Sequence, residues 1–242
     1  MKRIFILQLC LCFAMVAKAQ LHLEANLCNN HLWRGIEVAD GLVLTADATY
    51  TTPGGYFTFG LWGGTNTQGS YKEFNHHVSF QMGGFKLALW DTYNFSPNAT
   101  YNNKEYFNYN ARTTGRFLDV TASYHCGKKF PILLSWSTVI FGRDRNTANT
   151  ENKYSTFVYA EYPIYEKDVW KLDTGLGGAF ALNRAGDSSH FFGTTEGIVH
   201  VALKLTRKIH IGNWTFPVHA QALWNPQSNK GFLQIGVEIF SF

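Results

Sequence analysis

Charged side chains recur at alternate positions within apolar segments of this chain, and they are its clearest candidates for chemistry. Lys204, for example, lies between Leu203 and Leu205. Because successive side chains of a strand point to opposite faces, the charged groups are predicted to share a face that the apolar residues do not. Such a face can act on ions and polar solutes, or its members can pair with one another. The candidates are Arg34, Asp47, Glu73, Lys86, Asp119, Glu161, Asp173, His200, Lys204, His219 and Glu238.

Arg34 differs from the other candidates because it lies between Trp33 and Gly35, where the first predicted strand ends. Its planar guanidinium could attract anions at the mouth of a lumen, or it could pair with Glu37 or Asp40. We favour the second role, in which an ion pair holds the loop that follows the strand.

The elements that must position these residues are strands. Apolar residues alternate with polar or small ones almost throughout the chain after residue 20, and no segment shows a sustained helical period. The pattern predicts about twelve strands, at residues 21–33, 41–51, 56–65, 71–82, 85–95, 116–126, 131–142, 154–163, 170–182, 197–207, 214–224 and 231–242.

Strand length and link length together favour a membrane-spanning barrel. A tilted strand needs about 9–11 residues to cross a bilayer, and the predicted strands have about that length or slightly more. Short turns alternate with longer loops at 96–115, 143–153 and 183–196, as in outer-membrane barrels. We therefore predict one all-β domain, a single antiparallel transmembrane β-barrel with short periplasmic turns and longer outer loops. A soluble β-sandwich or lipocalin-like barrel would share the alternation but would not need such long strands.

The barrel prediction assigns the two faces of each strand. A lysine or arginine facing lipid at the bilayer midplane costs about 2–4 kcal/mol, so the charged face should line the lumen and the apolar face should meet lipid. Aromatic residues near predicted strand ends fit the girdles that such barrels carry at the membrane interfaces. They include Trp33, Trp62, Trp170, Trp214 and Trp224.

The N-terminus and the composition both indicate export. A basic start, an apolar stretch at residues 4–16 and small residues at Ala17 and Ala19 form a secretory signal pattern. We predict a cleaved signal peptide at residues 1–19 and the barrel at residues 20–242. Only 16% of residues are charged, compared with about 25% in typical soluble domains. Removing the peptide lowers the formal net charge from +4 to +1, so a nucleic-acid partner is not expected.

No pattern in the sequence predicts catalysis, a metal or a cofactor. His76 and His77 are adjacent, so in a strand they point to opposite faces and cannot ligate one metal without distortion. Nucleophile-elbow, phosphate-loop and paired-carboxylate patterns are all missing from the sequence. An outer-membrane lipase would require a serine near a histidine on the lipid face, and the sequence places none beside His76.

A run of distinctive segments begins with Asn29-Asn30-His31-Leu32-Trp33-Arg34-Gly35-Ile36, then Asp40-Gly41, then Pro53-Gly54-Gly55-Tyr56-Phe57 and Gly60-Leu61-Trp62-Gly63, and then Glu73, and is followed by strands rich in glycine and aromatic residues up to Phe242. On these residues the chain resembles the TorF-type porin family of bacterial outer-membrane β-barrel proteins over nearly the whole mature chain, with the distinctive residues in its first third. The resemblance implies an outer-membrane barrel with a pore role and no established substrate.

The C-terminal Phe242 looks like the terminal aromatic residue that such barrels present to the barrel-assembly machinery. Phe240 and Phe242 share a register with Glu238, so the apolar alternation changes phase there unless a bulge intervenes.

These features predict a non-enzymatic porin of the bacterial outer membrane that passes small polar solutes through a narrow polar lumen. Its expected partners are outer-membrane lipids, the assembly machinery and those solutes. One alternative is a non-conducting structural or ligand-binding barrel that acts through its outer loops. Another is a lipase-like enzyme of the outer membrane.

Overall fold

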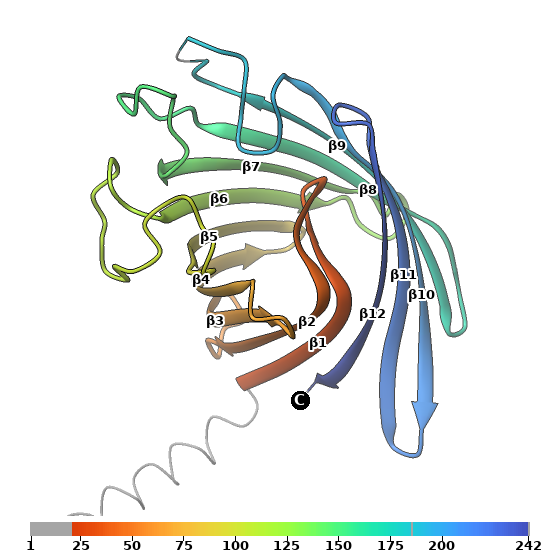
Figure 1. Cartoon of the computed structure of the whole chain (residues 1–242). Helices are drawn as coiled ribbons and strands as arrows, with labels where there is room; N and C mark the ends of the chain where they lie inside the picture. The colour runs from red at the N-terminus through yellow and green to blue at the C-terminus, as the bar shows by residue number, and fades with distance from the viewer. Residues whose placement is uncertain (1–20, 185, 242) are drawn as a thin grey trace, which may run out of the picture.

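The chain forms a closed barrel of twelve antiparallel strands, each hydrogen-bonded to its neighbours in sequence, with the last paired to the first (Figure 1). The computed structural model describes residues 21–184 and 186–241, so the predicted signal peptide and Phe242 lie outside the described residues. This architecture confirms the predicted all-β fold class and strand count.

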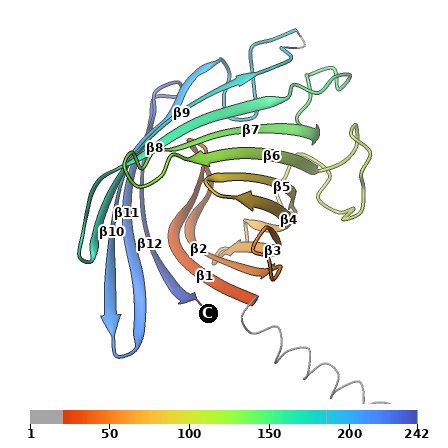
Figure 2. The same cartoon turned by 180° about the vertical axis from the view of Figure 1, so that it is seen from behind.

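All twelve predicted strands are present, and most boundaries agree within two residues. They are β1 (Leu21–Trp33), β2 (Ile36–Thr51), β3 (Phe57–Asn66), β4 (Lys72–Met82), β5 (Phe85–Asn94), β6 (Arg116–His125), β7 (Leu133–Gly142), β8 (Ser155–Lys167), β9 (Trp170–Ala181), β10 (Gly197–Ile211), β11 (Trp214–Asn225) and β12 (Lys230–Ser241). The longest loops gather at one end of the barrel, and the β8–β9 and β10–β11 turns lie at the other (Figures 1 and 2).

The largest difference from the expected boundaries is at β2, which begins five residues early. Arg34 and Gly35 have φ values of 47° and 87°, and Trp33 pairs with Ile36. Two consecutive residues with positive φ form the tight turn whose twist suits a β-hairpin. The predicted loop between the first two strands is therefore a two-residue turn, and the hairpin continues through Asp40 with register shifts between His31 and Leu32 and between Cys28 and Asn30.

The outer surface of the barrel is apolar and the inner surface is mixed. Leu44 on β2 and Leu203 on β10 point outward and are 44% and 50% exposed, whereas Val43 points inward and is 1% exposed. Trp170, Trp214 and Trp224 also lie on the exposed outer surface. Among the described residues, no helix is long and apolar enough to cross a membrane.

The seam between β1 and β12 is short. The two strands pair at only five positions of β1, Glu24–Cys28, whereas β1 pairs with β2 along its whole length. Beyond Cys28 the β1–β2 hairpin leaves the wall and turns into the barrel (Figures 1 and 2). Asn29 extends the seam with its side chain, which donates to the Leu233 carbonyl at 3.0 Å and accepts from the Ile235 amide at 2.6 Å.

The phase change near the C-terminus is absorbed by a register shift in this seam. Glu238 pairs with Asn26 and Phe240 pairs with Ala25, so Ile239 is an extra residue between them. The bulge keeps Glu238 on the inner face and leaves Phe240 exposed.

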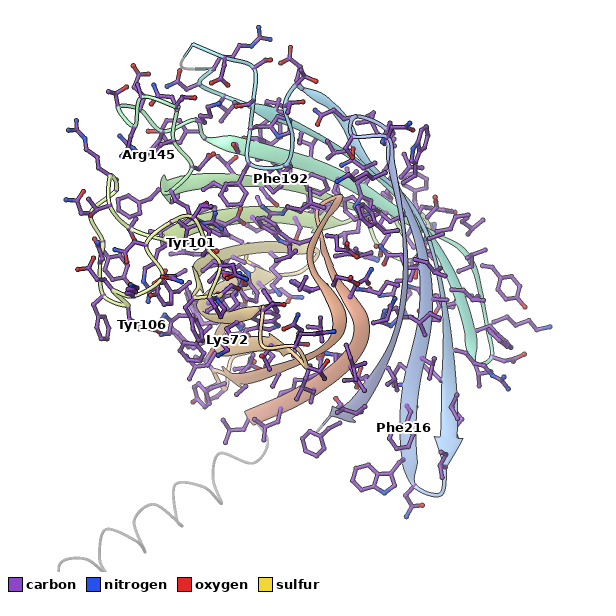
Figure 3. All side chains as sticks on the ribbon, viewed as in Figure 1. Lys72, Tyr101, Tyr106, Arg145, Phe192 and Phe216 are labelled. Carbon is purple, nitrogen blue, oxygen red and sulfur yellow. The ribbon has the colours of Figure 1, made fainter. Side chains whose placement is uncertain are left out.

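The loop between β5 and β6 covers polar groups on the outside of the wall. Asp91 is in register with Leu118 and so lies on the outward face. The side chain of Arg116 is fully buried and donates to Asp91 at 2.6 Å and to the Tyr106 carbonyl at 2.7 Å. Its guanidinium also lies 4.3 Å from the ring centroid of Tyr106, and Tyr109 donates its hydroxyl to Asp91 at 2.7 Å. These contacts hold the loop, whose Tyr106 is labelled in Figure 3, against the barrel.

Replacing Asp91 should release this loop. Removal of one partner from a buried ion pair costs about 3–5 kcal/mol because the other charge stays buried without compensation. In Asp91→Ala we expect chymotrypsin to cleave within residues 95–115 at least about tenfold faster than in the wild type. Lys104→Ala, at an exposed position of the same loop, is the control and should leave the rate unchanged. Equal rates in all three proteins would show that the pair does not anchor the loop.

Candidate functional site

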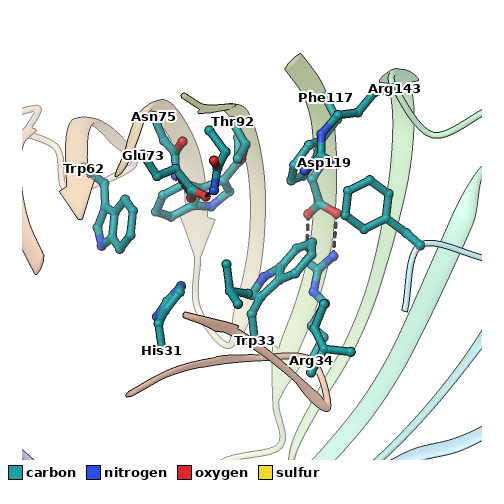
Figure 4. Close-up of a pocket in the computed structure, with 15 residues that line it drawn as sticks. His31, Trp33, Arg34, Trp62, Glu73, Asn75, Thr92, Phe117, Asp119 and Arg143 are labelled. Carbon is teal, nitrogen blue, oxygen red and sulfur yellow. Dashed lines mark hydrogen bonds and ion pairs between the residues drawn. The ribbon is translucent and has the colours of Figure 1, made fainter. Parts of the chain in front are cut away.

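The tip of the β1–β2 hairpin and the inner wall enclose a cavity of about 480 Å³ inside the barrel (Figure 4). This volume is in the range of small-molecule binding sites. His31, Trp33, Arg34, Ile36 and Val38 of the hairpin form one side. The facing wall is formed by Trp62, Glu73, Asn75, Trp90, Thr92, Asn94, Phe117 and Asp119, and the loops add Arg143 and Phe191.

Arg34 crosses the lumen and binds β6. Its guanidinium donates to both carboxylate oxygens of Asp119, at 2.5 and 2.7 Å, and to Thr121 at 3.2 Å. The Asp119 side chain is only 3% exposed and that of Arg34 14%. Such a two-bond pair is the strongest geometry available to these groups. The Arg34 side chain therefore joins the hairpin to the opposite wall of the barrel.

The prediction that Arg34 pairs with Glu37 or Asp40 was wrong. Glu37 instead accepts a hydrogen bond from the Asn30 amide at 2.9 Å, and Asp40 accepts one from the Gly41 backbone at 2.7 Å. The physical reason is the inward course of the hairpin, which carries the Arg34 side chain away from its sequence neighbours and toward β6.

The tip is held on its other sides as well. The Asn225 side chain donates to the Gly35 carbonyl at 2.9 Å, and a Cβ on Gly35 would lie 2.0 Å from the Val199 carbonyl oxygen. Only glycine combines this close approach with a positive φ. Trp33 packs on Phe192, with ring centroids 5.1 Å apart. The hairpin tip therefore contacts β6, β10, β11 and the β9–β10 loop.

The β9–β10 loop is fixed in place by Lys153, whose side chain is 5% exposed. Its ammonium donates to Asp187 and to the Ser189 carbonyl, the latter at 2.9 Å. The hydrogen bonds from Lys153 and Ser189 lower the pKa of Asp187 to about 2. These contacts hold the loop whose Phe191 and Phe192 pack against Trp33 of the hairpin, and Phe191 lines the cavity.

Two opposite charges line the cavity without an ionic partner among the described residues. The Glu73 carboxylate accepts hydrogen bonds from the side-chain amides of Asn75 and Asn94, at 2.8 and 3.2 Å. Arg143 lies with its guanidinium 3.9 Å from the ring centroid of Tyr101, and its buried Nε has no hydrogen-bond partner. Burial lowers the pKa of Arg143, and the charges of Tyr101 and Glu73 partly oppose that shift.

Of the eleven candidate residues, the structure brings only Arg34, Glu73 and Asp119 to this cavity. The strand register places the others on the inner face, elsewhere along the lumen. Four have close polar partners: Asp47 with His77 at 3.0 Å, Asp173 with Lys171 at 2.8 Å, Glu161 with the Tyr159 hydroxyl at 2.9 Å and His219 with Gln234 at 3.3 Å. His200 lies against aromatic rings, and Lys86, Lys204 and Glu238 have no side-chain hydrogen bond or ion pair within the described part of the chain.

The cavity also contains residues that the sequence analysis missed. Arg143 follows β7 directly, in a loop where no alternation applies, so no sequence signal marked it. Trp33 and Trp62 were expected in an interfacial girdle, but they line the cavity because the hairpin carries Trp33 inward and Trp62 belongs to the inner face of β3.

The two adjacent histidines have separate environments. His76 lies on the outward face against the Tyr106 hydroxyl at 3.0 Å, whereas His77 lies inside, stacked on Trp90 with centroids 4.2 Å apart. No group of three potential metal ligands occurs within the described ranges. Cys28 and Cys126 are both free thiols.

Comparisons with known proteins find only remote structural likeness. No family model matches the chain, and no curated protein sequence is significantly similar to it. The chain is 11% identical to an outer membrane channel from Pseudomonas putida F1, over 90% of this chain and 93% of that one, with a TM-score of 0.46. It is 11% identical to a Rhodopseudomonas blastica porin, with a TM-score of 0.39, and 13% identical to Pseudomonas aeruginosa OccK1, with a TM-score of 0.38.

These matches cover 83% and 91% of this chain, but it spans only 55% of the porin and 60% of OccK1. None of these matches identifies a family for the chain. The resemblance to TorF-type porins therefore stays a prediction.

A double-mutant cycle on Arg34 and Asp119 should reveal the tie across the lumen. We expect each single alanine variant to lose about 3 kcal/mol of unfolding free energy, because it leaves one buried charge unpaired. The double variant should lose at least about 1 kcal/mol less than the sum of the singles. Urea unfolding in detergent, followed by tryptophan fluorescence, gives these values. Glu37→Ala is the control and should cost only about 1 kcal/mol. Strictly additive losses would rule out the direct pair.

Proposed function

We propose that the protein is an outer-membrane channel that passes small polar solutes through a lumen narrowed by its own β1–β2 hairpin. The observation that carries this proposal is a closed barrel with an apolar exterior and a polar, charged interior that encloses a cavity. In water the exposed leucines would be a liability, whereas lipid stabilises them. Each strand of the closed barrel is also paired with a neighbour on both sides, as a bilayer requires, and the Asn29 side chain extends the short seam between β1 and β12.

The hairpin defines where the channel is narrowest. A twelve-stranded barrel is wider than an eight-stranded one, whose side chains alone fill the interior. Here the hairpin tip occupies the additional space, and Arg34 ties it to Asp119 on the far wall. Solutes must therefore pass beside the tip or displace it, which favours small solutes.

The hairpin tip acts as a plug in the lumen, and this plug supports a second candidate function. Trp33, Phe191 and Phe192 pack together across the end with the long loops, and a permanently closed barrel would serve as a structural or ligand-binding protein. Conductance separates the two candidates.

Conductance should increase when the ion pair between Arg34 and Asp119 is removed. In planar bilayers we expect the wild type to show small unitary currents and the Arg34→Ala/Asp119→Ala variant to show currents at least about twofold larger, because the tip no longer has its anchor. The heat-dependent shift in electrophoretic mobility that folded barrels show is the control for assembly. Folded wild-type and variant proteins that are both electrically silent would favour the closed structural barrel.

Neighbouring residues of β10 test the assignment of the two faces. Lys204 is on the inner face, so Lys204→Glu should shift the reversal potential toward cation selectivity while the protein still assembles. Leu203 is on the outer face, so Leu203→Lys should reduce assembly into liposomes at a cost of about 2–4 kcal/mol if it lies near the bilayer midplane. Normal assembly of Leu203→Lys together with failed assembly of Lys204→Glu would contradict the membrane placement.

A further inference from the structure

Two oppositely charged side chains in the cavity beside the hairpin have no direct ion-pair partner within the described residues. Glu73 and Arg143 both line the cavity, yet no described residue forms an ion pair with either. Figure 4 shows them on different sides of the cavity, with Trp33 and the Arg34–Asp119 pair between the hairpin and the wall. Both residues are only partly exposed, and a charge with limited access to water and no ionic partner favours an occupant of opposite sign.

We propose that this cavity binds a small zwitterion, with its ammonium group at Glu73 and its carboxylate at Arg143. A simple anion would leave Glu73 unpaired, a simple cation would leave Arg143 unpaired, and a neutral polyol would satisfy neither. Only a ligand carrying both charges completes the site. This inference deepens the proposed function, on which it rests, by naming the class of solute that the channel selects.

The wall around Glu73 suits an ammonium group. Asn75 and Asn94 both donate to the carboxylate, which orients it and leaves its remaining lone pairs for a ligand. Trp62 is paired directly with Asn75 across β3 and β4, so its indole lies on the same inner face as Glu73. Indole rings attract ammonium groups, and aromatic rings next to a carboxylate are a recurring way to bind alkylated ones.

The opposite end suits a carboxylate. The Arg143 guanidinium is packed against the rings of Tyr101, Phe191 and Phe117, at 3.9, 4.7 and 5.2 Å. These contacts fix its plane while its buried Nε remains without a partner. A pre-oriented guanidinium binds carboxylates through two parallel hydrogen bonds. The Arg34 guanidinium does not compete for the ligand, since Asp119 already holds both of its terminal nitrogens.

The first experiment compares intact zwitterions with their halves, using the wild-type mature chain in a non-ionic detergent. Zwitterionic detergents are avoided because their headgroups carry the same two charges. Calorimetry measures glycine betaine against choline and pivalate, and L-valine against isobutylamine and 3-methylbutanoate, with glucose as the neutral probe. We expect at least one zwitterion to bind at least about tenfold more tightly than either of its halves and than glucose. If neither does so, the proposal is wrong.

The second experiment assigns the two ends of the ligand. Glu73→Gln should weaken binding of the zwitterion about tenfold or more and abolish its advantage over the carboxylate half. Arg143→Gln should do the same with respect to the amine half. Arg184→Gln and Glu196→Gln, which remove the same charges from an exposed ion pair of the β9–β10 loop, are the matched controls and should bind as the wild type does. Unchanged affinity in folded Glu73→Gln and Arg143→Gln would overturn the assignment.

Conductance separates failure of this inference from failure of the channel. If unitary currents occur but no zwitterion binds or blocks them, the channel stands and the ligand class is wrong. If zwitterions bind selectively and no current flows, the site stands and the barrel is a binding protein. Should either cavity variant fail to fold, the comparison of zwitterions with their halves on the wild type still decides the proposal.

Discussion

The ion pair between Arg34 and Asp119 is the constraint on which the interior of this barrel depends. It joins residues 85 positions apart in the sequence and holds the β1–β2 hairpin inside the lumen rather than in the wall. The cost of burying the two charges is offset by two short hydrogen bonds and by Thr121. Gly35 then lies so close to the Val199 carbonyl that no side chain fits at this position of the tip.

The inward hairpin has a consequence for the wall. Backbone pairing between β1 and β12 stops at Cys28, and side chains replace the missing ladder. The Asn29 side chain bonds the Leu233 carbonyl and the Ile235 amide on the edge of β12 that faces β1, and the Gln234 side chain donates to the Asn30 carbonyl at 2.9 Å. Buried backbone groups must find partners, so these amides are needed wherever the hairpin leaves the sheet. Asn29 and Asn30 thus mark the point in the sequence where the hairpin leaves the sheet.

The sequence was sufficient to predict the barrel because alternation and link length depend only on local residues. It was insufficient for the site, which depends on contacts between distant segments. Alternation placed Glu73 and Asp119 on the correct face but could not show that Arg34 would reach β6 instead of Glu37. Arg143 lies in a loop without periodicity, and the outward Asp91 became acceptable only because a loop covers it. Local patterns identify faces, whereas partners follow from the three-dimensional course of the chain.

The hairpin also links the two properties proposed for the lumen. Trp33 and Arg34 belong at once to the plug and to the lining of the cavity, so any displacement of the tip removes one side of the ligand site. A ligand that binds only the closed cavity would stabilise the plug, because it adds its binding free energy to one of the two states. If a solute instead leaves the cavity only when the tip moves, the solute can pass only when the channel opens. If the barrel conducts as proposed, occupancy and conductance depend on the same ion pair in both cases, and selectivity would then be coupled to opening.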